Sequence, residues 1–309
     1  MENLIIKKTI NAHSNYVSYL CIIKNNRFAS CSFDHSIKIF NSENLECEYN
    51  IIVHNKYVIF ITQLKNENIL SCSCDKTLKI IELKENRNFN VIQTLYGHQS
   101  TVSFAVELNS GKIISCSKDL TMRIWVKNKN INLYQCECIL NFIKERIYSI
   151  FEIISNKMEC KLLLYYSNLS FLCENEFCVY KKIHLKKPIK NFNVICQIDN
   201  KFLLCEEHSI SIYDVNFIQK INEIKVKNNI EFISKLRNQT FFSQTKNGTL
   251  TLYNIEENRN NFEYITKIKD YNLFSFSSLF LIQINVNQFA LSLINEYVIT
   301  ILEIENIKN

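Results

Sequence analysis

The sequence consists of short apolar runs separated by polar turns, and this pattern is clearest in residues 96–125. Three apolar runs follow one another there: Val102–Val106, Ile113–Ser117 and Met122–Trp125. Gly111 and Asp119 stand between the runs, at the points where the chain has to turn. Apolar runs of this length between turn residues predict β-strands. Residues 96–125 are therefore predicted to form one small antiparallel sheet that opens with Gly97-His98.

Five positions of this stretch recur twice upstream at the same spacing. The three sets are His98, Val102, Ser115, Asp119 and Trp125; His13, Val17, Ser30, Asp34 and Phe40; and His54, Val58, Ser71, Asp75 and Ile81. In each set the histidine and the aspartate are 21 residues apart. A fixed period of about 40 residues is typical of repeat folds. The three stretches are therefore predicted to form equivalent sheets.

Weaker copies extend the repeat to the end of the chain. One set keeps the spacing with an Asn-Gly turn in place of the aspartate: Ile230, Ser243, Asn247 and Tyr253. Near the end, Asn295 and Ile301 keep the spacing of the turn and of the strand end. The third strand of each repeat is predicted to end near residues 40, 81, 125, 172, 213, 253 and 301. The sequence therefore predicts an all-β fold of seven units.

The polar residues of each copy are predicted to form a buried hydrogen-bonded chain. In the clearest copy Asp119 holds His98, which in turn holds Ser115. Ser115 then reaches the indole N–H of Trp125. The same roles are predicted for His13, Ser30 and Asp34, and for His54, Ser71 and Asp75. Buried polar groups require partners of this kind, so these residues are interpreted as structural.

The same three residue types also make up a catalytic triad. A nucleophilic serine has to be exposed beside an oxyanion hole, whereas Ser115 lies within a predicted strand. Its counterparts Ser30 and Ser71 recur at identical spacing, which a single catalytic site does not require. We therefore predict no catalytic residue and a protein that is not an enzyme.

Thirteen cysteines are present, and two pairs, Cys72/Cys74 and Cys136/Cys138, are spaced to share a strand face. Two ligands do not complete a zinc site, which takes four. Cysteine also recurs at one repeat position, as Cys31, Cys72 and Cys116, where a small apolar residue fits. We therefore predict no metal and no cofactor.

The odd number of cysteines and the absence of a secretory leader favour a reduced, cytoplasmic location, with the nucleus as the alternative. The most apolar run, residues 273–286, is interrupted by polar residues and is shorter than the roughly 18 residues of a spanning helix. No membrane insertion is expected.

The net charge is +6, and the densest basic run is Lys181–Lys190. Lysine commonly protects a solvated edge strand, and this interpretation is favoured over a phosphate-binding patch. No aromatic and basic RNA-binding signature accompanies the run. Nucleic acid is therefore not the expected partner, and RNA or another anionic partner remains the second alternative.

The Gly97-His98 pair, the turn Asp119 and the closing Trp125 resemble the WD40 family, whose repeats run from a Gly-His pair to a Trp-Asp pair. The resemblance implies one seven-bladed β-propeller over residues 1–309, regular in 1–126 and degenerate in 127–309. It also implies that Leu4–Ile10 closes the ring as the outermost strand of the last blade. Most copies lack the indole, and their blades are expected to depend more on apolar packing.

In this family, partners bind at the rim that carries the Gly-His loops. The matching positions here are Tyr16, Ser18, Phe33, Tyr57, Ile59, Cys74, Thr101, Ser103 and Lys118. The exposed aromatic residues among them are of the kind that anchors interfaces. The resemblance thus implies a scaffold or adaptor that holds one or more proteins, as part of a multiprotein complex.

A narrower resemblance leads to a second functional hypothesis. The runs TLYGHQSTV and SCSKDLTMRIW, followed by YQCECIL, are similar to the propeller that targets cytosolic iron–sulfur protein assembly. In such proteins a basic residue before the third turn aspartate matters for function, and Lys118 is the matching position. This role is the first alternative to a generic adaptor.

Overall fold

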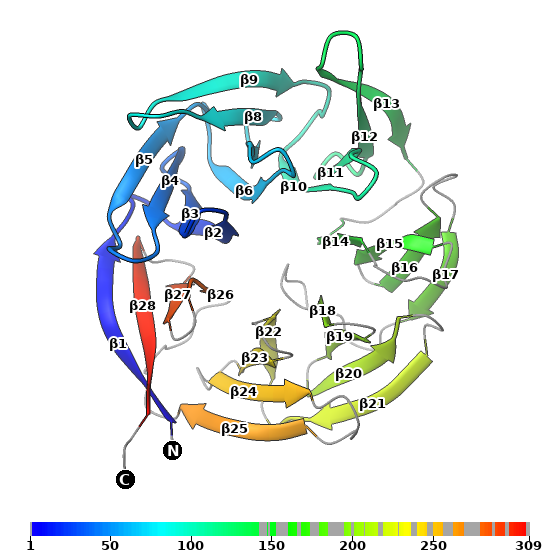
Figure 1. Ribbon diagram of the computed structural model, residues 1–309. Helices are drawn as coiled ribbons and strands as arrows, with labels where there is room; N and C mark the ends of the chain where they lie inside the picture. The colour runs from blue at the N-terminus through cyan, green and yellow to red at the C-terminus, as the bar shows by residue number, and fades with distance from the viewer. Residues whose placement is uncertain are drawn as a thin grey trace. The chain divides into compact units, whose positions relative to one another are not determined.

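The computed structural model describes most of the first half of the chain and many strands of the second. The described residues are 2–141, 147, 149–152, 160–165, 168–173, 179–184, 195–198, 201–206, 208–215, 219–227, 229–235, 240–245, 250–255, 262–268, 279–285, 288–293 and 297–306. Within these residues the chain forms seven four-stranded antiparallel sheets (Figure 1). Among them, no helix has the length and apolar character needed to cross a bilayer.

The first three sheets follow the chain in simple order. Their strands are β2 (Val17–Ile23), β3 (Arg27–Ser32), β4 (Ser36–Asn41) and β5 (Cys47–Ile52); β6 (Val58–Gln63), β7 (Ile69–Ser73), β8 (Leu78–Leu83) and β9 (Phe89–Leu95); and β10 (Val102–Glu107), β11 (Ile113–Ser117), β12 (Met122–Lys127) and β13 (Tyr134–Leu140).

The next three sheets repeat this order. They contain β14 (Ser149–Glu152), β15 (Cys160–Tyr165), β16 (Asn168–Cys173) and β17 (Val179–His184); β18 (Ile195–Ile198), β19 (Lys201–Glu206), β20 (Ser209–Asp214) and β21 (Gln219–Lys225); and β22 (Ile230–Lys235), β23 (Thr240–Thr245), β24 (Leu250–Ile255) and β25 (Phe262–Ile268). The predicted third-strand ends at residues 172, 213 and 253 lie in β16, β20 and β24, which confirms these predictions.

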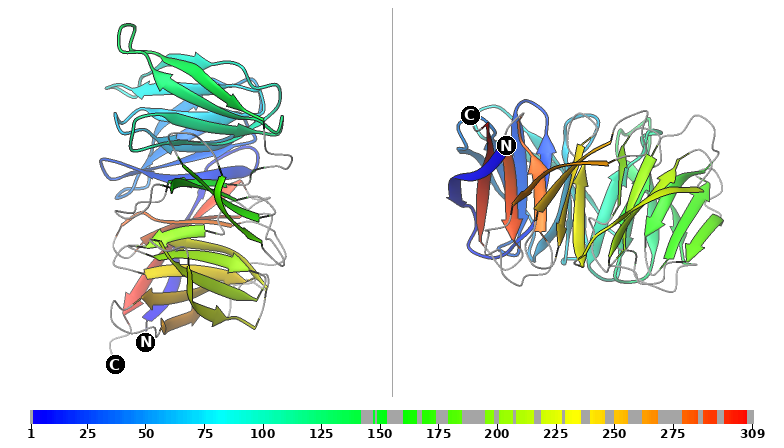
Figure 2. Two further views of the ribbon diagram at one scale, coloured as in Figure 1. Left: turned by 90° about the vertical axis from the view of Figure 1, so that its right-hand side faces the viewer. Right: turned by 90° about the horizontal axis from the view of Figure 1, so that it is seen from below.

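The last sheet combines the two ends of the described chain. Its order is β1 (Glu2–Asn11), β28 (Val298–Asn306), β27 (Gln288–Leu293) and β26 (Leu279–Gln283). β1 lies directly beside β28 (Figure 1 and Figure 2), and Lys7 forms an ion pair with Glu303 at 3.2 Å. The predicted pairing of Leu4–Ile10 with the strand that contains Ile301 is therefore confirmed. Closure of the sheets into a ring stays a prediction.

The chain divides into two compact units. The N-terminal unit comprises Ile10–Ile150 and Asn295–Ile299, and the C-terminal unit comprises Met1–Thr9, Phe151–Ile294 and Thr300–Asn309. In the N-terminal unit β6 packs against both β2 and β10. Its first two sheets share a core of buried aliphatic side chains that includes Ile39, Ile61 and Ile69. The assignment of residues 1–309 to one domain stays a prediction.

The first strands of the three regular sheets contain a bulge at the same place. The strand register shifts between Val17 and Tyr19, between Val58 and Phe60, and between Val102 and Phe104. A bulge adds one unpaired residue and redirects the side chains around it. The added residues are Ser18, Ile59 and Ser103, so the bulge recurs at the equivalent position of each repeat.

Aromatic pairs replace the closing indole in three sheets. Phe28 stacks on Phe40 with ring centroids 5.1 Å apart. The other two pairs are Phe202–Tyr213 and Phe241–Tyr253, each with centroids at 4.8 Å. In each pair the two residues lie opposite one another on neighbouring strands. Such cross-strand pairs stabilise a sheet, which supports the expectation that these sheets depend on apolar packing.

The residue after each turn aspartate has a left-handed backbone. The φ angles are 72° at His35, 73° at Lys76 and 64° at Leu120. This region is unfavourable for residues with a Cβ and most unfavourable for bulky ones. Leu120 also remains 43% exposed, so its side chain gains little from burial.

Replacing Leu120 by Gly is therefore expected to stabilise the protein by about 0.5–1 kcal/mol, because glycine adopts this backbone without strain. Urea unfolding of the wild type and of Leu120→Gly measures the difference. Leu120→Asn is the matched control, since asparagine tolerates the conformation and keeps a side chain. A loss of stability in both variants would contradict this account of the turn.

Candidate functional site

A buried hydrogen-bonded chain fixes one end of the third sheet. His98 Nδ1 lies 2.9 Å from Asp119 Oδ2, and His98 Nε2 lies 2.8 Å from Ser115 Oγ. Trp125 Nε1 donates to Ser115 Oγ at 2.9 Å. These contacts fit a neutral His98 that donates from Nδ1 and accepts the Ser115 hydroxyl at Nε2. The structure thus brings together the four side chains that the sequence pattern associates.

The first two sheets contain the same arrangement without the indole. His13 lies 2.9 Å from Asp34 and 2.7 Å from Ser30. His54 lies 2.8 Å from Asp75 and 2.7 Å from Ser71. These distances match those of the third sheet, and all three histidines are buried. In the first two sheets an aspartate and a serine therefore hold each histidine as they hold His98, without an indole.

Each turn aspartate is stabilised as a carboxylate. Burial alone would raise the pKa of Asp119, but hydrogen bonds from Thr121, Gln99 and His98 outweigh it and lower the pKa to about 2. Burial likewise opposes ionisation of Asp34 and Asp75. Hydrogen bonds from the neighbouring histidine and from Ser36 or Thr77 nevertheless hold the pKa of both carboxyls well below the usual range.

These groups do not form an exposed nucleophilic site. Ser115 lies in the middle of β11 and is fully buried, and its hydroxyl oxygen already accepts the Trp125 N–H. Burial also lowers the pKa of His98, despite the carboxylate beside it. His98, Ser115 and Asp119 therefore fit a structural role. The end of the three sheets that carries these histidines is called the histidine end of the N-terminal unit. It comprises the loops before β2, β6 and β10 and the turns that carry the three aspartates.

The predicted rim residues meet in pairs at the histidine end. A backbone N–H···O bond of 2.9 Å joins Phe33 to Tyr16, Cys74 to Tyr57, and Lys118 to Thr101. The same bond in three sheets shows that these positions are structurally equivalent. Tyr57 and Lys118 are exposed, and the other four residues are half-buried. Six of the nine rim residues therefore lie together at this end, as three equivalent pairs.

The remaining three rim residues occupy the bulges. The single proton of the Ser18 hydroxyl lies within reach of two carbonyl oxygens, that of Cys31 and that of Val58 in the neighbouring sheet. Ile59 is half-buried, and Ser103 is only 1% exposed. Ser103 is therefore out of reach of a partner in this structure, while Ser18 contributes to the contact between sheets.

The aromatic residues of the histidine end form a continuous row. Phe33 and Tyr57 stack with ring centroids 4.5 Å apart and an interplanar angle of 7°. Tyr16 meets the edge of Phe33 at 6.1 Å and stacks on Tyr297 at 5.6 Å. Tyr57 and Tyr297 remain 43% and 47% exposed. We call Tyr297, Tyr16, Phe33 and Tyr57 the aromatic row.

Tyr297 was not among the residues expected from the sequence. It lies two residues after Asn295, the position that matches the turn aspartate of the earlier sheets. In those sheets the same position holds Ser36, Thr77 or Thr121, each of which donates to its aspartate. The sequence therefore did carry a signal for Tyr297, because a tyrosine stands where the other copies have a small hydroxyl residue. The His13 N–H donates to the Tyr297 carbonyl at 3.0 Å and fixes the residue there.

The described cysteines do not gather into a metal site. Cys31, Cys72 and Cys116 are buried at equivalent positions, and burial raises the pKa of the Cys31 and Cys72 thiols. Cys136 and Cys138 lie on the edge strand β13, away from further ligands. Within the ranges that the structure describes, no group of three or more His, Cys, Asp or Glu could hold a metal ion.

The basic run 181–190 begins in β17, which is the edge strand of its sheet. Its residues 181–184 pair with β16, with Ser170 opposite Lys182 and Asn168 opposite His184. Residues 185–190 lie outside the described part of the chain. The location of Lys182 on an edge strand agrees with the interpretation that lysine protects it.

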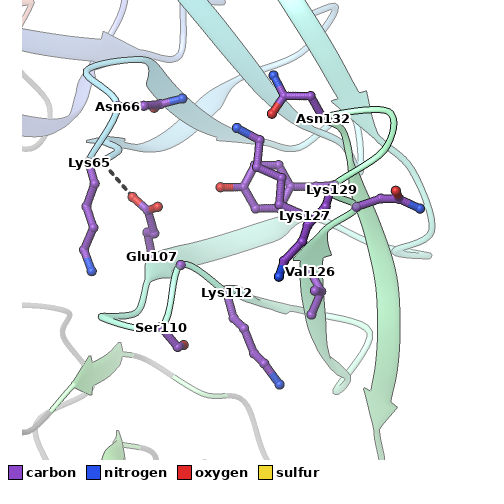
Figure 3. A pocket seen from close by; sticks show the side chains of 12 residues that line it. Lys65, Asn66, Glu107, Ser110, Lys112, Val126, Lys127, Lys129 and Asn132 are labelled. Atoms are coloured by element: carbon purple, nitrogen blue, oxygen red, sulfur yellow. Dashed lines mark hydrogen bonds between the residues drawn. The ribbon is translucent and has the colours of Figure 1, made fainter.

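A pocket of about 580 Å³ lies at the opposite end of the N-terminal unit (Figure 3). Several lysines line it, but neighbouring groups engage three of them. Lys65 Nζ donates to the Leu108 carbonyl at 2.9 Å, and Lys112 pairs with Glu137 at 3.1 Å. Lys127 Nζ lies over the Tyr134 ring at 5.9 Å. The pocket therefore lacks a convergent set of free cations, and the histidine end is the better candidate site.

Comparison with known protein families identifies part of the repeat. The family model described as WD domain, G-beta repeat matches residues 5–41 and 89–126. These segments include the first sheet's β2 to β4 and the third sheet's β10 to β12. The chain therefore contains WD40 repeats. No curated protein matches the chain.

Proposed function

We propose that this protein is a non-catalytic scaffold that binds one or more proteins through the histidine end of its N-terminal unit. WD40 repeat proteins typically act as protein-interaction scaffolds, and the matched repeats include the loops of His13 and His98. The aromatic row is the observation that carries the proposal. Tyrosine is enriched among the residues that dominate binding energy at protein interfaces.

The row is organised for binding by its own contacts. Stacking of Phe33 on Tyr57 and of Tyr16 on Tyr297 restricts the rings before any partner arrives. An interface built from preorganised side chains loses less conformational entropy on association. The two ends of the row, Tyr57 and Tyr297, remain exposed and offer the area that a partner would bury.

Capture of partners by tagged protein tests the proposal. Tyr57→Ala is expected to weaken partner binding by about 2 kcal/mol, or roughly 30-fold in Kd, because an exposed tyrosine anchor is lost. The melting temperature should change little, since Tyr57 is exposed. The matched control is Phe89→Ala. It removes an exposed aromatic residue at the start of β9, at the end of the sheet opposite the histidine end. Loss of capture in the control and not in Tyr57→Ala would contradict the proposal.

A role in cytosolic iron–sulfur protein assembly is a narrower proposal. It is supported by the sequence of the third repeat and by Lys118, which is exposed at the histidine end beside Thr101. Pull-down of iron–sulfur assembly proteins by the wild type, and its loss in Lys118→Ala, would favour this role. Capture of unrelated proteins at the same surface would favour a different scaffold.

A further inference from the structure

The charges at the histidine end are not balanced. Lys56, Lys76 and Lys118 are exposed there, and none forms an ion pair with a described residue. The acidic side chains among the described residues of this end are Asp34, Asp75 and Asp119. Each of these is already hydrogen-bonded to its histidine and is about nine-tenths buried. The exposed charge of this surface is therefore positive.

The polar groups of the aromatic row add further donors. The hydroxyl groups of Tyr16, Tyr57 and Tyr297 form no hydrogen bond with any residue that the structure describes. Phenol O–H groups and ammonium groups donate hydrogen bonds, whereas carboxylates only accept them. The surface thus presents lysine ammonium groups and tyrosine hydroxyls as free donors, and a partner rich in acceptors would satisfy them.

The opposite end of the same unit differs in this respect. Three of its lysines form ion pairs with glutamates: Lys24–Glu67 at 3.0 Å, Lys84–Glu82 at 3.4 Å and Lys112–Glu137 at 3.1 Å. Solvated pairs of this kind contribute little stability, but they cancel the local field. At the histidine end, by contrast, Lys56, Lys76 and Lys118 have no acidic partner among the described residues.

We infer that the partner segment bound at the histidine end is an acidic peptide that places an apolar side chain against the aromatic row. This inference rests on the proposed function and specifies its partner. The lysines would attract the Asp and Glu side chains of the segment and orient it. The row would bury the apolar side chain, with the tyrosine hydroxyls at its border available to carboxylates or to peptide carbonyls.

An acidic peptide fits this surface better than RNA. RNA-binding platforms offer free aromatic faces on which unstacked bases lie. Here the rings stack on one another, with an interplanar angle of 7° for Phe33 and Tyr57 and of 19° for Tyr16 and Tyr297. Arg123, which also lies at this end, already donates to the Gly97 carbonyl at 2.9 Å instead of offering its whole guanidinium fork to a phosphate.

Selection from a library of short random peptides, with the full-length protein immobilised, tests the inference. The selected peptides should carry net negative charge and at least one apolar residue, and their affinity should fall with rising salt. The triple variant K56E/K76E/K118E should weaken their binding by roughly tenfold or more, because like charges then face each other. The control variant K84E/K127E/K129E reverses the same number of charges at the opposite end and should bind as the wild type does.

Each other outcome overturns the inference. Selection of neutral or basic peptides, failure to select any, or equal losses in the two triple variants would do so. A single-stranded RNA that binds more tightly than the peptides and competes with them would assign the surface to nucleic acid. If selection fails while Tyr57→Ala still abolishes protein capture, the acidic assignment is wrong and the proposed function stands. If the histidine-end variants keep both peptide binding and protein capture, the acidic-peptide inference and the proposed function are both wrong.

Discussion

Replacing Phe40 by Ala is expected to lower the free energy of unfolding by about 3–5 kcal/mol, the usual cost of removing a buried aromatic side chain. Phe40 is 2% exposed and stacks on Phe28, which lies opposite it on β3. In this sheet the pair stands where the third sheet has Trp125. Its loss would leave a cavity beside Phe28 that the close-packed sheet cannot fill by small movements.

Denaturant unfolding measures the effect, and Ile52→Ala is the matched control. Ile52 belongs to the same sheet but is 64% exposed. Ile52→Ala should lower the free energy of unfolding by less than about 0.5–1 kcal/mol, as surface substitutions usually do. A loss at Phe40 no greater than that at Ile52 would show that this sheet does not depend on its aromatic pair.

Replacing Asp119 by Ala is expected to cost about 2–3 kcal/mol, because the change leaves the buried His98 ring and the partly buried Thr121 donors without their acceptor. Asp119 accepts hydrogen bonds from His98 Nδ1, the Gln99 N–H and both the N–H and the hydroxyl of Thr121. Asp34 and Asp75 accept the same four bonds in their own sheets. Equal losses are therefore expected at the three sites, and a much smaller loss at either would contradict their equivalence.

The acid dependence of stability provides a check on the same turn. The pKa of Asp119 is lowered from 3.8 to about 2 in the folded state, so its contribution is fully present above pH 3.8 and is lost as the pH falls through about 2. This contribution is on the order of 2 kcal/mol. The pKa of His98 is lowered from 6.5, chiefly by burial. Folding therefore disfavours protonation of His98. The stability that its neutral form provides is present above pH 6.5 and is lost as the pH falls below that value. Asp119→Asn should lose stability less steeply between about pH 4 and pH 2 than the wild type.

The hydrogen-bonded chain could be predicted because its members have a fixed spacing. A turn aspartate, a loop histidine and a strand serine can meet only if the intervening strands have constant length. The 21-residue separation of His98 and Asp119 recurs in the other two sheets, so one geometry accounts for all three. Repetition is informative in this way because each copy independently tests the same arrangement.

The bulges and Tyr297 could not be predicted in the same way. An alternating pattern assigns side chains to faces only if every residue is paired, and the bulge at Ser103 breaks that rule. Tyr297 joins the aromatic row from the far end of the chain. Its copy of the repeat retains too few of the marker residues to identify its surroundings. A contact between segments so distant in sequence depends on packing rather than on local pattern.

Site-specific photocrosslinking tests most directly whether the histidine end is the binding surface. The photoreactive residue p-benzoyl-phenylalanine would replace Tyr57 in one variant and Phe89 in another, since both side chains are exposed aromatics of the N-terminal unit. Illumination in cells, followed by purification under denaturing conditions, reveals the proteins that contact each position. We expect defined protein adducts from position 57 and none of the same proteins from position 89. Adducts from position 89 alone would contradict binding at the histidine end.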